Sequence, residues 1–199
     1  MGADGHFRVT LSLRREPAAG PVYCKMETSA RFRQLKTVKL SCEAMYRLDI
    51  SFKPPQLLQW FWWSLCRHRR RRRRSRRRRR CRIKWIRFTI ENDSLIGGKQ
   101  VEAIERARDG TACAYSAYHS TKGIPASARG HREELSIAMR VLGSGYLTTC
   151  LQIKYYRQDD QSHCEWGARL HCIELDCTSV EGRLVTVDRE TYRKLGIES

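Results

Sequence analysis

The sequence predicts an all-β protein, in the form of a filled antiparallel β-barrel or sandwich of about eight to ten strands. Three observations predict this class: short segments of alternating apolar and polar residues, glycine- and proline-bearing turns between them, and little helical periodicity. A chain of 199 residues suits one domain, so a single domain over residues 1–199 is expected. The interior is expected to be filled because large side chains take inward positions, among them Tyr46, Phe52, Leu151 and Ile153.

The N-terminal part of the chain is expected to open with an antiparallel hairpin. Apolar and polar residues alternate over residues 7–13, and a turn containing two prolines and a glycine follows at residues 17–21. The clearest alternation ends at Pro54-Pro55, because proline has no amide hydrogen to give to a sheet. The strands predicted in this part are Phe7–Leu13, Val22–Met26, Thr37–Leu40 and Tyr46–Phe52.

The C-terminal part continues the pattern. Leu147–Tyr155 and His171–Cys177 alternate, and a polar reversal at residues 157–162 is expected to lead into a partner strand near Cys164. Helical periodicity is confined to Arg189–Leu195 and, more weakly, to Val101–Arg108, which are therefore the two expected helices. Weaker patterns predict further strands at Phe88–Ile90, Cys113–Tyr118, Leu135–Met139 and Leu184–Val187.

One segment supplies most of the net charge of +18. Residues 60–88 hold 15 Lys and Arg and no Asp or Glu, which leaves 24 of the 39 basic residues against 21 acidic ones elsewhere. The same segment contains four of the five tryptophans. These two changes in composition predict an insertion at 60–88, disordered because dense like charges repel. Two origins are considered, a lineage-specific loop and untranslated sequence read through by a faulty gene model, and the second is favoured.

The arginines of this segment suggest an alternative function, that of a basic nucleic-acid- or polyanion-binding protein. Each guanidinium can contact a phosphate bidentately, and released counterions would drive a salt-dependent association, although a solvated loop is the simpler interpretation. The aromatic run at residues 60–63 would also suit a membrane interface, but it is too short to lie deeply. The arginines that would contact a polyanion are Arg69, Arg70, Arg71, Arg72, Arg73, Arg74, Arg76, Arg77, Arg78, Arg79 and Arg80.

Motifs of catalysis or metal binding are missing from the sequence, so we expect no enzyme, catalytic residue, metal or cofactor. Nine cysteines without framework spacing, and no apolar N-terminal signal region, predict free thiols in a cytoplasmic protein. The longest apolar run, Leu57–Cys66, is too short for a membrane-spanning helix. Zinc is disfavoured because adjacent His171 and Cys172 would point to opposite faces of a strand. The residues weighed for zinc are His163, Cys164, His171, Cys172 and Cys177.

Ordered motifs lie on both sides of the arginine-rich segment: Gly20-Pro-Val-Tyr-Cys-Lys25, Thr37-Val-Lys-Leu40, Tyr46-Arg-Leu-Asp-Ile50, Leu95-Ile-Gly-Gly98, Ile153-Lys-Tyr-Tyr156 and His163-Cys-Glu-Trp-Gly167. Together they resemble the cannabinoid receptor-interacting protein 1 family over roughly residues 7–59 and 88–195. The resemblance implies a filled antiparallel β-barrel related in shape to Rho GDP-dissociation inhibitors. It also implies a non-catalytic cytoplasmic adaptor that binds the C-terminal tail of the type-1 cannabinoid receptor, a G-protein-coupled receptor, and modulates its signalling at the plasma membrane.

Three residues are the candidates for contact with a partner. Alternation places Lys154 and Tyr156 outward and Tyr155 inward, and Trp166 is either a binding aromatic or a core or lid residue. The stretches 99–108 and 196–199 depart from the family pattern, so partner preference could differ. The shape of a Rho inhibitor would also allow a third function, a carrier of a hydrophobic ligand or lipidated partner, which requires an empty interior.

Overall fold

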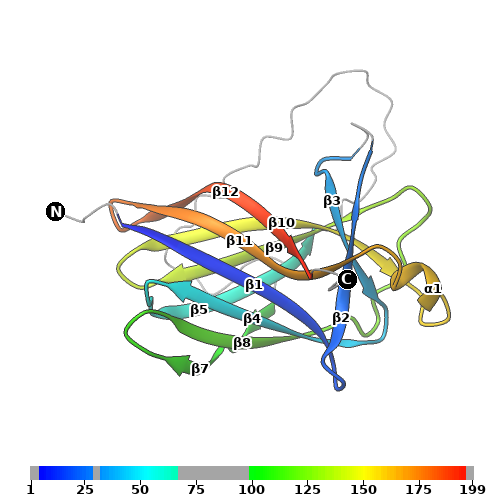
Figure 1. Cartoon of the computed structure of the whole chain (residues 1–199), viewed down its shortest axis with the longest axis horizontal. Coiled ribbons are helices and arrows are strands. Elements are labelled where there is room, and N and C mark those ends of the chain that lie inside the picture. The colour runs from blue at the N-terminus through cyan, green and yellow to red at the C-terminus, as the bar shows by residue number, and fades with distance from the viewer. Residues whose placement is uncertain (1–4, 29–31, 67–98, 196–199) are drawn as a thin grey trace.

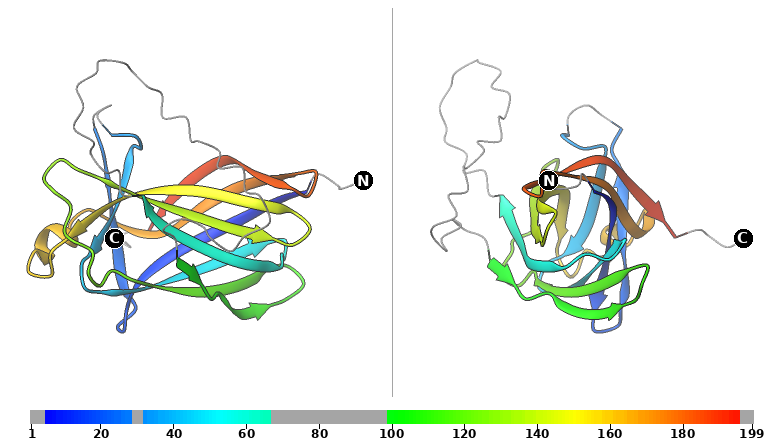
Figure 2. Two further views of the ribbon diagram at one scale, coloured as in Figure 1. Left: turned by 180° about the vertical axis from the view of Figure 1, so that it is seen from behind. Right: turned by 90° about the vertical axis from the view of Figure 1, so that its left-hand side faces the viewer.

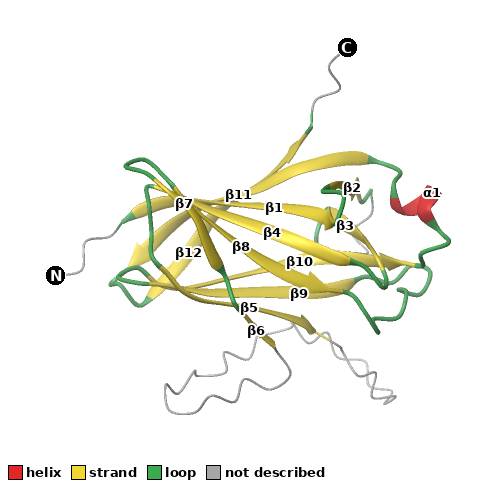
Figure 3. Cartoon of the chain, turned by 90° about the horizontal axis from the view of Figure 1, so that it is seen from below, coloured by secondary structure: helices red, strands yellow, loops and turns green. Residues whose placement is uncertain are grey.

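The computed structural model describes residues 5–28, 32–66 and 99–195, and these form one continuous sheet of twelve strands (Figure 1). The all-β prediction is thereby confirmed, and Figure 3 shows how little of the described chain is helical. The elements are β1 (His6–Glu16), β2 (Gly20–Met26), β3 (Lys36–Ser41), β4 (Met45–Lys53), β5 (Leu58–Cys66), β6 (Lys99–Val101), β7 (Ile104–Arg108), β8 (Cys113–Ser120), β9 (Glu133–Val141), β10 (Gly145–Tyr156), α1 (Gln161–Cys164), β11 (Ala168–Val180) and β12 (Leu184–Lys194).

The order of strands brings the two ends of the sheet together. It runs β6-β5-β9-β10-β12-β11-β2-β1-β4-β8-β7, and β3 pairs with both β10 and β2. The terminal strands β6 and β7 are consecutive in the chain, with Glu102 and Ala103 between them. The chain therefore passes directly from one end of the sheet to the other, and the strands surround a common centre when viewed along the long axis (Figure 2).

Apolar side chains fill that centre. β1, β2 and β4 bury alternate residues, as period-2 geometry requires. The four large residues predicted to face inward, Tyr46, Phe52, Leu151 and Ile153, are no more than 2% exposed. Tyr155, also predicted inward, is 1% exposed. The filled core gives the described part of the chain a rigid scaffold for side chains on its outer surface.

The sheet is mixed, which corrects the prediction of an antiparallel one. β3 and β12 both run parallel to β10 and share one of its edges, β12 at Tyr146 and Leu147 and β3 from Ile153 onward. Between these two contacts the Gln34 side chain pairs with the β10 backbone, accepting from Gln152 N at 2.9 Å and donating to Cys150 O at 2.5 Å. The amide takes the place of a missing strand along that edge.

Both predicted helices are wrong, because the two segments are strands. The first expected helix was Arg189–Leu195. All of it except Leu195 belongs to β12, which pairs with β11 along its length. Outward Arg189 and Arg193 donate to Asp176 and Glu174 of β11 at 2.9 and 3.0 Å, so cross-strand ion pairs replace the helical contacts that the spacing suggested.

Tertiary pairing also overrides local preference at two other segments. Residues 101–108, the other expected helix, form the end of β6 and all of β7, which pair with β5 and β8. The partner strand expected near Cys164 is instead the single turn of α1. Within the described ranges no helix is long and apolar enough to cross a membrane.

The first residues of the predicted insertion are part of the sheet. β5 continues to Cys66 and pairs with β9 from Leu58 onward. Phe61 and Trp63 are 0% and 5% exposed in the core, whereas Trp60 and Trp62 face outward. The prediction of disorder is therefore wrong for residues 60–66, where four adjacent aromatic residues conceal the alternation. Residues 67–98, with the polyanion-contacting arginines and the predicted strand Phe88–Ile90, lie outside the described residues.

A buried histidine joins the two halves of the sheet and makes stability depend on pH. The His119 ring of β8 packs edge-on against Trp63 of β5 with centroids 4.0 Å apart. Burial lowers the pKa of His119 to about 4. The unfolded chain, with a histidine pKa of about 6.5, therefore binds the proton more readily. The stability that neutral His119 contributes is fully present above about pH 6.5 and is lost as the pH falls toward 4.

We expect the free energy of unfolding to fall by about 2 kcal/mol more between pH 7.5 and pH 5 in the parent protein than in a His119→Phe variant. Urea denaturation at both pH values measures this difference. His131→Gln, which alters an exposed histidine, is the control and should retain the parent's pH dependence. An unchanged pH profile in His119→Phe would show that this ring does not titrate in the way its burial requires.

Candidate functional site

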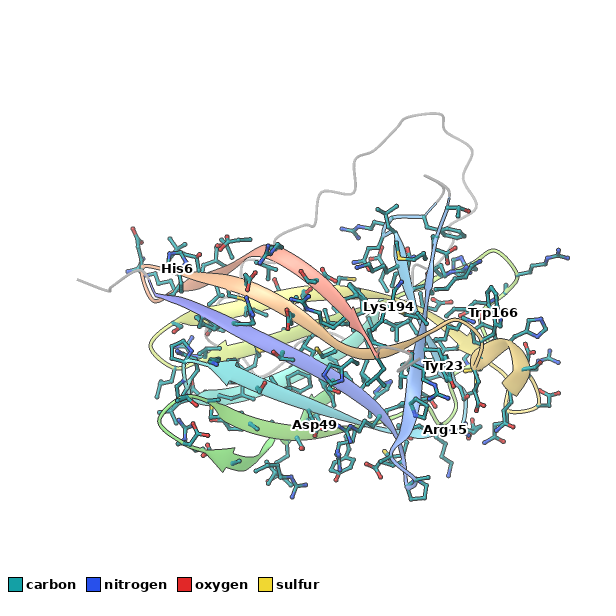
Figure 4. The ribbon with its side chains drawn as sticks, in the orientation of Figure 1. His6, Arg15, Tyr23, Asp49, Trp166 and Lys194 are labelled. Carbon is teal, nitrogen blue, oxygen red and sulfur yellow. The ribbon has the colours of Figure 1, made fainter. Side chains whose placement is uncertain are left out.

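Lysine and aromatic side chains gather on the outer surface where β2, β3 and β10 pair. Lys39 of β3 lies opposite Tyr23 of β2 on one side and opposite Lys154 of β10 on the other. Directly opposed residues share a face of the sheet, so these side chains stand together on the surface away from the core. We call this surface the lysine–aromatic face and define it by Tyr23, Lys25, Lys39, Lys154, Tyr156 and Trp166. Tyr23 and Trp166 mark its end of the molecule in Figure 4, and His6 marks the opposite end.

Lys39 lies at the centre of the face although the whole residue is only 3% exposed. Its ammonium group donates to His163 O at 2.6 Å and to Trp166 O. The same group lies 5.4 Å from the centroid of the Tyr156 ring and 5.3 Å from that of Trp166. Both distances fall within the range of cation–π attraction. Lys39 therefore links β3, β10 and the turn after α1 through a single charge.

The other lysines extend the positive charge across the face. Lys154 Nζ lies 4.6 Å from the centroid of the Tyr156 ring. Burial lowers the pKa of Lys154, and the positive charge of Arg132 lowers it further. Burial is also the main reason that the pKa of Lys39 is lowered, and Lys25 and Lys154 both contribute in the same direction. The ammonium groups are therefore close enough to repel one another.

The turn that carries Trp166 depends on a glycine. Gly167 has φ +120°, and a Cβ atom there would lie 2.8 Å from the backbone oxygen of Cys24 in β2. The missing side chain lets the turn approach β2 closely. Ala168 then begins the pairing of β11 with β2 opposite Cys24. Trp166, which is 67% exposed, is held out over the face by this arrangement.

We expect Gly167→Ala to lower the free energy of unfolding by about 1–3 kcal/mol, because the new Cβ meets backbone and a positive φ strains any other residue. Gly110→Ala is the matched control, since a Cβ there would have no atom within 4 Å. Urea denaturation compares the two variants. Equal stability of both would mean that the turn does not need the close approach at Gly167.

A buried ion pair between Arg132 and Glu27 lies next to the face. Arg132 donates to Glu27 Oε1 through two nitrogens, at 2.8 and 2.6 Å, and Thr37 Oγ1 donates to the same oxygen at 2.7 Å. Burial by itself raises the pKa of the Glu27 carboxyl, but the hydrogen bonds from Thr37 and Arg132 outweigh it, and the net pKa is lowered. Gln152 of β10 donates to Thr37 Oγ1 at 2.8 Å, which completes the link from β2 to β10.

The structure brings the three sequence-predicted partner residues, Lys154, Tyr156 and Trp166, onto one surface. Lys154 is half-buried and Trp166 exposed, whereas Tyr156 is only 8% exposed because Lys39 and Lys154 lie against its ring. Sequence reasoning missed Lys39, since nearly every residue of β3 is buried and the strand shows no polar face. The one signal in the sequence was a charged residue between two apolar residues, Val38 and Leu40, which indicates a lysine with a specific role.

The histidine and cysteine residues weighed as zinc ligands are spread over different surroundings. Cys164 lies with its sulfur 3.4 Å from Ser41 Oγ, and His163 accepts or donates at 2.6 Å with Asp160. His171 is exposed while Cys172 beside it is buried. In the described ranges no three His, Cys, Asp or Glu side chains gather as a metal ion would require.

Known proteins are similar in sequence to the parts of the chain that form this surface. The family model for CB1 cannabinoid receptor-interacting protein 1 matches residues 3–61 and 86–192. The proteins of that name from Bos taurus and Homo sapiens are each 28% identical over 191 residues, covering 94% of this chain and 96% of the relative's own length. The Mus musculus protein of the same name has the same identity and coverage. All six residues of the lysine–aromatic face fall in the matched ranges.

Proposed function

The chain belongs to the CB1 cannabinoid receptor-interacting protein 1 family, and from this premise we propose that it is a non-catalytic adaptor. In this proposal it binds the C-terminal tail of a type-1 cannabinoid receptor and modulates the receptor's signalling. The observation that carries the proposal is the family match over both halves of the chain, residues 3–61 and 86–192. The relatives' name states an interaction with the receptor, and the tail and the effect on signalling are the proposed refinements.

The lysine–aromatic face is the proposed contact surface for the tail. It combines a 67% exposed tryptophan with lysines whose ammonium groups repel one another. Aromatic residues are enriched at binding surfaces, and positive charge attracts an acidic partner. The filled core beneath it holds β2, β3 and β10 in register, which presents these side chains without rearrangement.

The proposed architecture is a closed β-barrel related in shape to Rho GDP-dissociation inhibitors. The direct passage of the chain from β6 to β7, the two ends of the sheet, supports closure. Side chains such as Phe52, Leu151 and Tyr155 occupy the centre, which favours an adaptor over a carrier that needs an empty interior for a lipid or lipidated partner. The proposed location is the cytoplasm, at the plasma membrane only through the receptor.

Isothermal titration of the full chain with a synthetic peptide of the receptor's C-terminal tail tests the adaptor proposal. Saturable one-to-one binding is expected, and its absence would overturn the proposal. A scrambled peptide of the same composition serves as the control for non-specific attraction to a chain of net charge +18.

A deletion of residues 67–85 separates the adaptor from the polyanion-binding alternative, because it removes the arginine-rich sequence and keeps all of β5. The deleted chain should bind the tail peptide as the full chain does. Binding to heparin, a polyanion, should fall sharply. Loss of tail binding on deletion would show that the arginine-rich segment, and not the sheet, is needed to bind the tail.

A further inference from the structure

We infer that the lysine–aromatic face binds an acidic, extended peptide segment, with a side-chain carboxylate beside Lys154 and a neighbouring apolar side chain against Trp166. The inference rests on the proposed function and adds to it the chemistry of the segment that is recognised. Three features of the face carry it: two lysines without an ion-pair partner among the described residues, an Arg132 fork that is already committed, and an exposed tryptophan.

Two of the three lysines of the face, Lys39 and Lys154, are not neutralised by an ion pair within the described part of the chain. Among the described residues, neither Lys39 nor Lys154 has a carboxylate oxygen within 4.0 Å. The Lys39 ammonium is satisfied by two backbone carbonyls, which carry no net charge. The nearest buried acid, Glu27, is taken by Arg132 at 2.6 Å and by Lys25 at 3.7 Å. An arriving carboxylate would therefore relieve repulsion among lysines whose pKa values are already lowered.

Lys39 and Lys154 present this charge beside Tyr156, and the exposed Arg169 of β11 lies at the edge of the face, opposite Tyr23. Phosphate recognition commonly uses the planar fork of arginine for bidentate contact. Arg132, whose charge acts on both lysines, has its fork committed to Glu27 and to the carbonyl of His131. Lys154 remains half-buried but accessible, as a point charge with donors to spare. A carboxylate can accept hydrogen bonds from such a point charge without needing a bidentate fork.

The shape of the face favours an extended chain with an apolar residue next to its acid. Lys39 and Tyr156 are only 3% and 8% exposed, so a segment lying across the face meets the half-buried Lys154 and the exposed Trp166 rather than the strands themselves. Trp166 offers an exposed ring whose position is fixed by Gly167 and by the Lys39 contact. Burying an apolar side chain against that ring would add to the affinity of the ion pair.

Fluorescence anisotropy with labelled peptides tests the inference on the full chain. The probe is fluorescein-Gly-Asp-Phe-Glu-Leu-Asp-Gly-amide, and its control is the amide isostere Gly-Asn-Phe-Gln-Leu-Asn-Gly-amide. We expect the acidic probe to bind at least about tenfold more tightly than the isostere, since hydrogen bonds to charged groups contribute more than neutral ones. Equal affinities would overturn the inference.

Two charge-matched variants locate the contact. Lys154→Gln should weaken the acidic probe about tenfold. Lys53→Gln removes one positive charge opposite Arg8, at the end of the sheet marked by His6, and should change affinity less than about twofold. Trp166→Ala should weaken the probe while leaving urea stability unchanged, because the ring is exposed. Equal effects of Lys154→Gln and Lys53→Gln would show that the probe senses only net charge.

Two further titrations separate this inference from its rivals. A probe with phosphoserine in place of each acidic residue should bind no more tightly than the acidic probe, and tighter binding would overturn the assignment of carboxylate. The receptor tail peptide is titrated against the same variants. Tail binding that is unaffected by Lys154→Gln would overturn the inference without contradicting the adaptor function. Binding of the acidic probe without binding of the tail peptide would overturn the adaptor function and leave the inference in place.

Discussion

Replacement of Phe61 by alanine is expected to lower the free energy of unfolding by about 3–5 kcal/mol. Phe61 is fully buried and packs against Trp63 with ring centroids 5.8 Å apart, so truncation leaves a cavity in the centre of the sheet. Its neighbour Trp62 points to the outer side of the same strand and is half-buried, so Trp62→Ala should cost less than Phe61→Ala. Urea denaturation of the two variants measures the difference.

This pair of variants decides where the core ends along the chain. The family match stops at residue 61, yet β5 continues to Cys66, so the described structure uses residues beyond the matched range to complete a strand. Similar, small losses for Phe61→Ala and Trp62→Ala would mean that β5 is not part of the core. A large loss for Phe61→Ala alone fixes the aromatic run within the fold.

The second large effect is expected at Arg132. Arg132→Met should lower the free energy of unfolding by about 3–5 kcal/mol, because it leaves the Glu27 carboxylate buried without its ion-pair partner. The expected recovery in the double variant Arg132→Met, Glu27→Gln is at least half of that loss, since the stranded charge is then removed. Urea denaturation of the four proteins completes the double-mutant cycle. No recovery in the double variant would show that packing of the Arg132 stem, rather than charge, accounts for the loss.

The same ion pair predicts a loss of stability in acid. The pKa of Glu27 is lowered in the folded protein, so the unfolded chain takes up the proton first. Its contribution is present above the unfolded carboxyl pKa of about 4.3 and is lost as the pH falls below it. Glu27→Gln should remove this part of the acid sensitivity, which is separate from the His119 effect at higher pH.

The sequence could predict the strands that have one face in the core and the other face toward solvent. β4 alternates between buried and half-buried residues along its whole length, and alternation predicted it within one residue at either end. β12 was missed over its second half because its outward charges, Arg189 and Arg193, have helical spacing. Their partners, Asp176 and Glu174, lie on another strand, and that pairing is set by tertiary structure rather than local pattern.

The site was predictable to a similar degree. Alternation placed Lys154 and Tyr156 on the outer surface, but it could not show that Tyr156 would be covered by two lysines. Lys39 could not be identified because the parallel pairing of β3 with β10, which sets it opposite Lys154, leaves no signal in either segment. A mixed sheet with two short parallel contacts lies beyond what residue periodicity specifies.

Hydrogen–deuterium exchange of the full chain, with and without saturating receptor tail peptide, tests the central claim most directly. The account predicts slower exchange in β2, β3, the C-terminal half of β10 and residues 160–168, because these segments form the lysine–aromatic face. Exchange in β7 and β8, which belong to another part of the sheet, should not change. Protection confined to β7 and β8, or to residues 67–85, would contradict it.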